Sequence, residues 1–201
     1  MNTRMSTRLA PVIGFGLVAL SVGVFVYGSN ESQARAAGEK TVDKVVKLAA
    51  AIKAGDKDAV KTQAAALAKV DLDEVMDAFK PRTKGGVGVG KKGSITPDGI
   101  ELKLQAMGRD APGAGVLAKE VDALEDMAYI IAAVAEVNLA KGAPAGVKGK
   151  GKDWDTWSQE MKDASTALIT AVKAKSSPDV KTVATKINNN CSACHAVFKS
   201  N

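Results

Sequence analysis

The fold is indicated most clearly by residues 116–141, which read VLAKEVDALEDMAYIIAAVAEVNLAK. Apolar side chains recur in this stretch at steps of four or three residues, at Leu117, Val121, Leu124, Ala128, Ile131, Ala135 and Leu139. Such a stripe is typical of a helix that packs in a bundle. The stretch therefore predicts a long helix with one face in a helical core.

Comparable patterns on both sides of this stretch predict more helices, over residues 41–54, 57–79, 100–107, 153–175 and 178–199. Turns rich in Gly, Pro and Ser separate them. No segment shows a sustained alternation of apolar and polar residues, and aromatic residues make up only 4% of the chain. The sequence therefore predicts an all-α fold.

The N-terminal residues 1–36 have the features of an export signal. Arg4 and Arg8 precede an uncharged apolar stretch from Leu9 to Gly28, and a small-residue site favours cleavage before Ala37. An uncleaved membrane anchor is the alternative, because about 20 apolar residues can span a bilayer. We therefore expect residues 37–201 to form an exported, periplasmic helical domain, which contacts the membrane only if the signal is retained.

The composition excludes several kinds of site. Two Cys and one His cannot supply a four-ligand zinc finger, a framework of several disulfides or any site that needs two histidines. The formal net charge of +6 is too small and too dispersed to indicate nucleic-acid binding.

The strongest functional signal is Cys191-Ser192-Ala193-Cys194-His195, near the end of the last predicted helix. Offsets of three and four residues place both thiols and the imidazole on one side of a helix. In an exported chain, this C-x-x-C-H spacing is typical of a haem held by two thioether bonds, with the histidine as an iron ligand. A dithiol redox site, a zinc site and a structural disulfide are the alternatives.

With this motif, the chain resembles the class II cytochromes c, which comprise cytochrome c-prime and its low-spin relatives. The resemblance rests on the C-terminal C-x-x-C-H, on Phe198-Lys199 after it, and on the helix opening Trp154-Asp155-Thr156-Trp157 before it. It implies an antiparallel four-helix bundle with one covalent haem c attached near the C-terminus of the last helix. In that family the first bundle helix covers the distal side of the haem, and in low-spin members it supplies a methionine.

An internal repeat predicts which methionine would face the haem. Residues 48–67 and 168–187, 120 positions apart, are identical at eight of twenty positions, which favours a duplicated helical hairpin. Continued further, the same offset places Val75 against His195, with Met76 beside it. Met76 is therefore the candidate distal iron ligand, although it could also be an ordinary core residue. Met161 is the second candidate, and Met107 and Met127 are weaker.

These features predict a monohaem c-type cytochrome that is not an enzyme but carries single electrons between redox partner proteins. The alternative is a five-coordinate, cytochrome c-prime-like protein that binds nitric oxide or carbon monoxide.

The glycine-rich loop 85–94 contains a pattern that resembles a nucleotide-binding motif. Gly85 to Lys91 satisfies G-x-x-x-x-G-K, but Lys92 stands where Ser or Thr must hold magnesium, and the preceding segment reads as helical. We therefore expect no nucleotide binding, and a loop that is either flexible or covers the haem.

Overall fold

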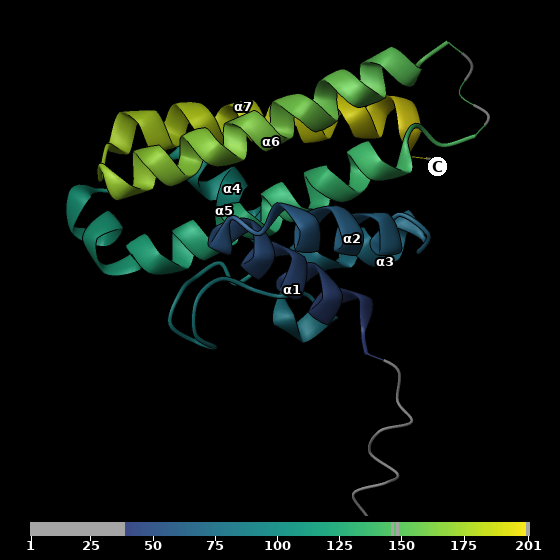
Figure 1. The fold of residues 1–201 in the computed structure, drawn as a ribbon. Helices are drawn as coiled ribbons and strands as arrows, with labels where there is room; N and C mark the ends of the chain where they lie inside the picture. Colours follow the sequence, from purple (N-terminus) through teal and green to yellow (C-terminus); the bar gives the residue numbers. More distant parts are fainter. Residues whose placement is uncertain (1–38, 146, 148, 200–201) are drawn as a thin grey trace, which may run out of the picture. The chain divides into compact units, whose positions relative to one another are not determined.

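A computed structural model of the chain describes residues 39–145, 147 and 149–199. This part of the chain contains no strand and forms seven α-helices (Figure 1), which are α1 (Thr41–Ala54), α2 (Lys57–Leu67), α3 (Leu72–Met76), α4 (Ile100–Arg109), α5 (Ala114–Lys141), α6 (Gly151–Lys173) and α7 (Ser177–Phe198). Two 3-10 turns, η2 (Asp77–Phe79) and η3 (Arg82–Lys84), lie between α3 and α4. The predicted all-α fold is confirmed for the described residues.

The predicted signal segment, residues 1–36, lies outside the described residues. Among the helices that the structure describes, none is both long enough and apolar enough to cross a membrane.

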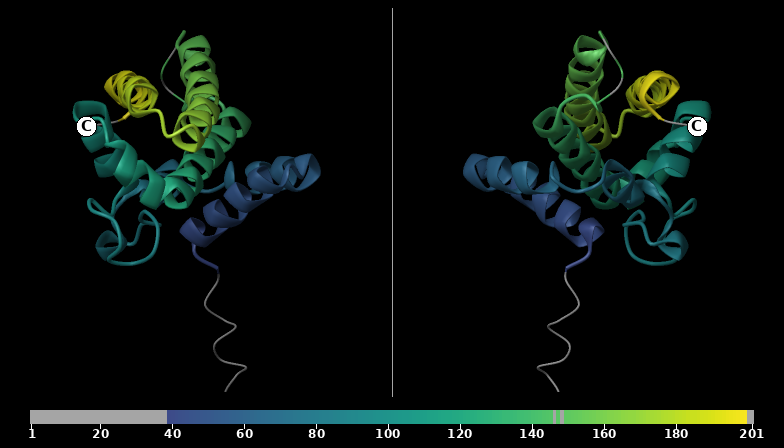
Figure 2. Two further views of the ribbon diagram at one scale, coloured as in Figure 1. Left: turned by 90° about the vertical axis from the view of Figure 1, so that its left-hand side faces the viewer. Right: turned by 90° about the vertical axis from the view of Figure 1, so that its right-hand side faces the viewer.

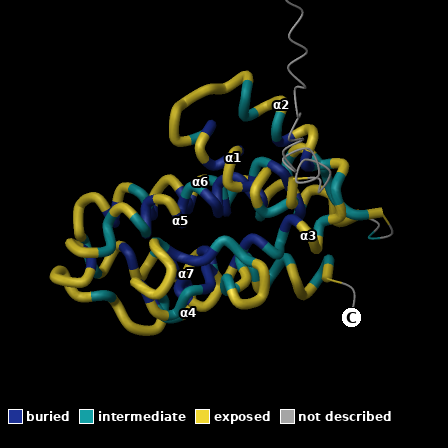
Figure 3. Tube along the Cα trace, turned by 90° about the horizontal axis from the view of Figure 1, so that it is seen from below, coloured by how far each residue is buried: buried dark blue, intermediate teal, exposed yellow. Residues whose placement is uncertain are grey.

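Helix α5 packs against α6, α1 and α2. Its predicted stripe is buried at Leu117, Leu124, Ala128, Ile131 and Ala135. Apolar residues outside the stripe are buried as well, for example Met127 and Val134, because helices contact α5 on more than one side. Buried and exposed segments alternate along the helices (Figure 3), as expected for helices that each turn one face to the core.

Helix α7 lies between α6 and α4 and contacts both of them (Figure 2). Together with the contact of α5 with α6, this arrangement brings the four C-terminal helices into one connected core. The predicted four-helix bundle with a haem at one end stays a prediction.

The hairpin turns of α1–α2 and α6–α7 share one backbone conformation. Gly55 and Lys175, at equivalent positions of the internal repeat, both have a positive φ, of 72° and 53°. The N-cap residues that follow, Asp56 and Ser176, have φ/ψ angles of −80°/89° and −83°/95°. In each turn the amide of this N-cap residue donates to the carbonyl five positions earlier, at 3.1 Å and 3.0 Å. The correspondence of the two sequences therefore extends to their turns.

Equivalent lysines also join the two hairpins to α5. Lys53 of α1 pairs with Asp126 at 2.7 Å, and Lys173 of α6 pairs with Glu125 at 2.9 Å. Both lysines are exposed, so each pair contributes little to stability. The pairs nevertheless show that the two hairpins contact neighbouring residues of α5 through the same position of the repeat.

The correspondence ends after α2, and the prediction of one helix over 57–79 is wrong. The helix stops at Leu67 because Lys141 of α5 donates to the carbonyls of Ala68 and Val70, at 3.0 Å and 2.8 Å, and so stabilises a turn there. Asp71 then begins α3 as its N-cap, since its carboxylate accepts from the amide of Asp73 at 3.0 Å. Helix α7, by contrast, continues without a break to Phe198.

Candidate haem-attachment site

Both thiols and the imidazole of the C-x-x-C-H motif lie in the last two turns of α7. Cys191 and Cys194 are half-buried and form no disulfide, whereas His195 is exposed. Upstream on the same helix, Ala184 and Ile187 are fully buried. The predicted grouping of the three motif residues on one helix is therefore present, at the point where α7 passes from the core to the surface.

The environment keeps both thiols protonated near neutral pH. Burial raises the pKa of the Cys191 thiol to about 11, and Cys194 and Glu101 add smaller contributions in the same direction. Burial also raises the pKa of Cys194. Thiols of dithiol redox sites work as thiolates and have a lowered pKa. The electrostatics therefore disfavour the dithiol alternative.

An aromatic cluster lies directly beside the motif. The ring of Phe198, one turn beyond Cys194, contacts Trp154 edge-to-face at 5.1 Å between centroids and Trp157 at 6.0 Å. Trp154 is only 1% exposed, and its indole N–H donates to the carbonyl of Asn138 at 2.9 Å. The cluster therefore ties the ends of α5, α6 and α7 together and gives the motif a rigid apolar neighbour.

Helix α4 lies on the other side of α7. Its N-terminal turn is close enough to the motif for the charge of Glu101 to raise the pKa of Cys191. Near its C-terminal end, Gly108 packs closely on α7, where an added Cβ would lie 3.0 Å from Asn188 and 3.3 Å from Thr185. The sequence predicted a short helix in this region but did not indicate that it would pack against the motif helix.

Met76 is the last residue of α3, which packs mainly on α1. Its side chain is half-buried and packs against the same apolar core as Cys191. The turn η2 that follows Met76 contacts α4, which in turn contacts α7. Met76 thus belongs to the core that adjoins the motif, and its role as distal ligand stays a prediction.

The other methionines occupy different parts of the core. Met161, Met107 and Met127 are all buried, on α6, α4 and α5. Asn190 bonds to the carbonyl of Trp157, so Met161 lies about one helical turn deeper along α6, away from His195. This placement weakens Met161 as the second candidate.

The glycine-rich loop 85–94 is held against the fold by contacts at Arg82 and Gly90, which disfavours a flexible loop, and a loop that covers the haem stays a prediction. The Arg82 guanidinium bonds to the Asp98 carboxylate and to the carbonyl of Gly90. A Cβ at Gly90 would lie 2.9 Å from the Ala123 side chain of α5. Ala123 is about 22 Å from Asn138 along that helix, at 1.5 Å per residue. The middle of the loop therefore lies away from the aromatic cluster.

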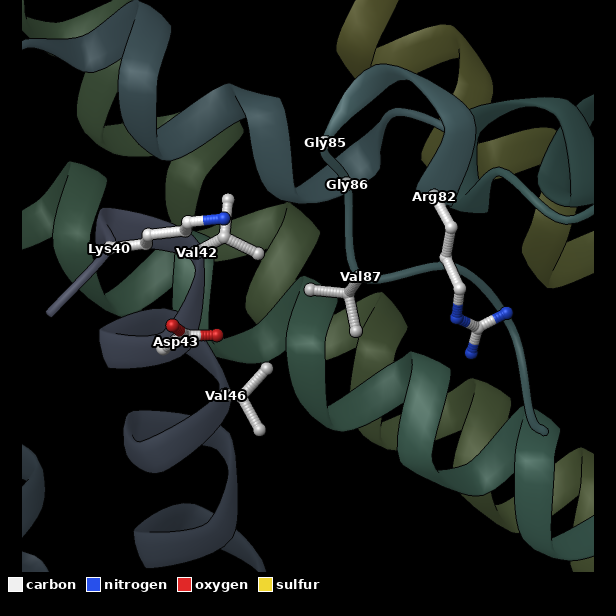
Figure 4. Close-up of a pocket in the computed structure, with 8 residues that line it drawn as sticks. All are labelled: Lys40, Val42, Asp43, Val46, Arg82, Gly85, Gly86 and Val87. Carbon is white, nitrogen blue, oxygen red and sulfur yellow. The ribbon is translucent and has the colours of Figure 1, made fainter. Parts of the chain in front are cut away.

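The loop borders two cavities, neither of which is lined by the motif. One, of about 340 Å³, lies between Val46 of α1 and Val87 of the loop (Figure 4). The other, of about 810 Å³, lies between α1, the loop and α5.

Gly86 is essential to the loop's path, because a Cβ there would lie 1.8 Å from the carbonyl oxygen of Lys80. A 3-10 turn precedes the loop where a nucleotide-binding motif would need a strand.

In the described part of the chain, no three His, Cys, Asp or Glu side chains are arranged to hold a metal ion. A haem iron takes its equatorial ligands from the porphyrin and needs one protein ligand on the proximal side, which His195 can supply. The residues present therefore fit a covalent haem: two free thiols at the required spacing and one accessible imidazole.

Comparisons of the chain with models of known protein families, with curated proteins and with solved structures give no match.

Proposed function

We propose that this chain is a periplasmic, monohaem c-type cytochrome that carries single electrons between redox partner proteins and is not an enzyme. One observation carries the proposal: the C-x-x-C-H residues lie together on α7, with both thiols free and protonated and the only imidazole of the chain accessible. The resemblance to the class II cytochromes c supports it.

Each residue of the site would have a separate role. Cys191 and Cys194 would form the two thioether bonds, and His195 would bind the iron on the proximal side. The bound haem would supply a one-electron couple between ferrous and ferric iron. Trp154, Trp157 and Phe198 would exclude water from one side of the attachment site, because their rings already pack together there.

Electron transfer favours a second axial ligand that stays bound in both oxidation states, and Met76 is our candidate. A methionine–histidine pair raises the reduction potential and suits a carrier. Met76 is half-buried, and the turn η2 that follows it contacts α4, the neighbour of α7, which supports this assignment.

The alternative is a protein with an open distal position that binds small gases. One observation favours it: α3 is a short helix of five residues that packs mainly on α1 and is separated from α2 by a turn. A methionine on so short a helix is held less firmly than one within a long helix.

The substitution Met76→Ala separates the two functions. If Met76 is the distal ligand, the oxidised wild type should show the weak near-infrared band of sulfur-to-iron ligation. The variant should lose this band and bind carbon monoxide when reduced, because its distal position is open. Absorption spectra of both oxidation states, with and without carbon monoxide, make the measurement.

Met161→Ala is the matched control. Met161 is buried, so its removal should cost about 2–5 kcal/mol of stability but leave the band in place. If the wild type lacks the band and binds carbon monoxide readily, the protein is the gas-binding alternative and not an electron carrier. Loss of the band in Met161→Ala, but not in Met76→Ala, would show that the ligand is assigned to the wrong helix.

A further inference from the structure

Three consecutive asparagines, Asn188 to Asn190, immediately precede Cys191. Asn188 donates its side-chain amide to the carbonyl of Leu104 on α4, at 3.0 Å. Asn190 is 9% exposed and donates its amide to the carbonyl of Trp157 on α6, at 3.4 Å. Within one turn of the first motif cysteine, one asparagine side chain of α7 therefore bonds to α4 and another bonds to α6.

The two bonds point in nearly opposite directions around the helix. Successive residues of an α-helix are 100° apart, so Asn188 and Asn190 are separated by about 200° around the axis of α7. A rotation of α7 in either direction would therefore stretch at least one of the two bonds. Asn189 lies between them and is exposed, so its side chain faces away from both contacts.

Upstream of the asparagines, the buried residues of α7 are Val180, Ala184 and Ile187, which are apolar and therefore give no directional bonds. The exposed Thr185 also reaches α4, where its hydroxyl lies 3.3 Å from the carbonyl of Gly108, but this hydroxyl lies closer, at 2.9 Å, to the carbonyl of Lys181 within α7. Buried polar contacts can fix the register of helices that apolar packing leaves open. A functional site also tolerates errors of only about 10–20° in the orientation of its side chains.

We propose that Asn188 and Asn190 are positioning residues that fix the rotation of α7, and with it the direction in which Cys191, Cys194 and His195 present a haem. The inference rests on the proposed haem function. It concerns the direction of the motif side chains rather than the stability of the fold, because the carbonyls of Leu104 and Trp157 lie within α4 and α6 and keep their backbone hydrogen bonds when an asparagine is replaced.

The test uses the full chain, matured with haem, with Asn188→Leu, Asn190→Leu and the control Asn189→Leu. The midpoint reduction potential, the ligand-sensitive absorption bands and the thermal unfolding midpoint are measured for each. We expect the two outer variants, Asn188→Leu and Asn190→Leu, to shift the midpoint reduction potential and to broaden or split the absorption bands without a loss of thermal stability. The control should match the wild type in its potential and bands, because Asn189 contacts neither neighbouring helix.

Conservative variants separate positioning from packing. Asn188→Gln and Asn190→Gln keep an amide donor and should restore the wild-type potential and a single set of bands. If a leucine variant does not fold, the alanine variant at the same position takes its place with the same expected shift.

Three outcomes overturn the inference. Outer variants with the wild-type potential and bands would show that the amides do not orient the motif. An equal shift in Asn189→Leu would show a non-specific effect of polarity on α7. If the wild type holds no haem, the proposed function itself is wrong, and the positioning role falls with it. The first two outcomes, by contrast, leave the haem in place and contradict only the positioning role.

Discussion

Replacing both motif cysteines, Cys191→Ser together with Cys194→Ser, should abolish covalent haem attachment and restore tryptophan fluorescence. The chain has only two tryptophans, Trp154 and Trp157, and both pack on Phe198, one turn beyond Cys194. Haem absorbs at the wavelengths where tryptophan emits. A haem attached at this site should therefore quench nearly all tryptophan emission of the wild type.

Two readouts give the result: acid–acetone extraction, which leaves only covalently bound haem with the protein, and the tryptophan emission spectrum. The control is Ser192→Ala, which changes an exposed residue between the cysteines and should leave both readouts as in the wild type. Equal emission from the wild type and the double serine variant would mean that no haem lies beside the aromatic cluster.

Replacing His195 with alanine should remove the native spectrum while it leaves the haem attached. His195 is the only imidazole of the chain, so no other histidine of a monomer can take its place on the iron. Its side chain is exposed in the structure, so the substitution should change the stability of the polypeptide without haem by only about 0.5 kcal/mol or less. The spectral change of the haem-loaded protein should therefore be large, and the change in unfolding of the haem-free polypeptide small.

Absorption spectra of the oxidised and reduced variant, with a urea unfolding curve of the haem-free polypeptide beside them, check this expectation. Lys186→Ala is a suitable control, because Lys186 is an exposed residue of the same helix outside the motif. A His195→Ala protein that keeps the unaltered spectrum would contradict the assignment of His195 as the proximal ligand.

Periodicity predicted the helices well where one face of a helix is buried over many turns. The first helix, 41–54, agrees with α1 at both ends, and the boundaries of the two last helices differ from the prediction by at most two residues. Gly55 at the α1–α2 turn is readable from sequence, because glycine readily adopts the positive φ found there.

The break after Leu67 was not predictable in the same way. It depends on Lys141, whose ammonium group reaches the carbonyls at the end of α2 from a helix more than seventy positions later. The local signal was Asp71 as an N-cap, but the apolar face from Leu72 to Phe79 continues the helical period and hid the break. A contact between distant segments overrode local periodicity here.

The motif itself was readable because its chemistry lies in five consecutive residues. Its surroundings were not, since the approach of α4 and the aromatic cluster arise from tertiary packing. The asparagines, however, have a recognisable local signal. Asparagine is disfavoured inside helices, so Asn190 within a helix and next to Cys191 indicates a tertiary hydrogen bond. The anchored glycine loop likewise depends on Arg82 and Asp98, sixteen positions apart.

The most direct test of the haem assignment is the intact mass of the chain, purified under denaturing conditions from a host that can attach haem c. The account predicts a mature polypeptide heavier by one haem, with neither Cys191 nor Cys194 available to a thiol reagent. A mass equal to that of the bare polypeptide, with both thiols labelled, would contradict it.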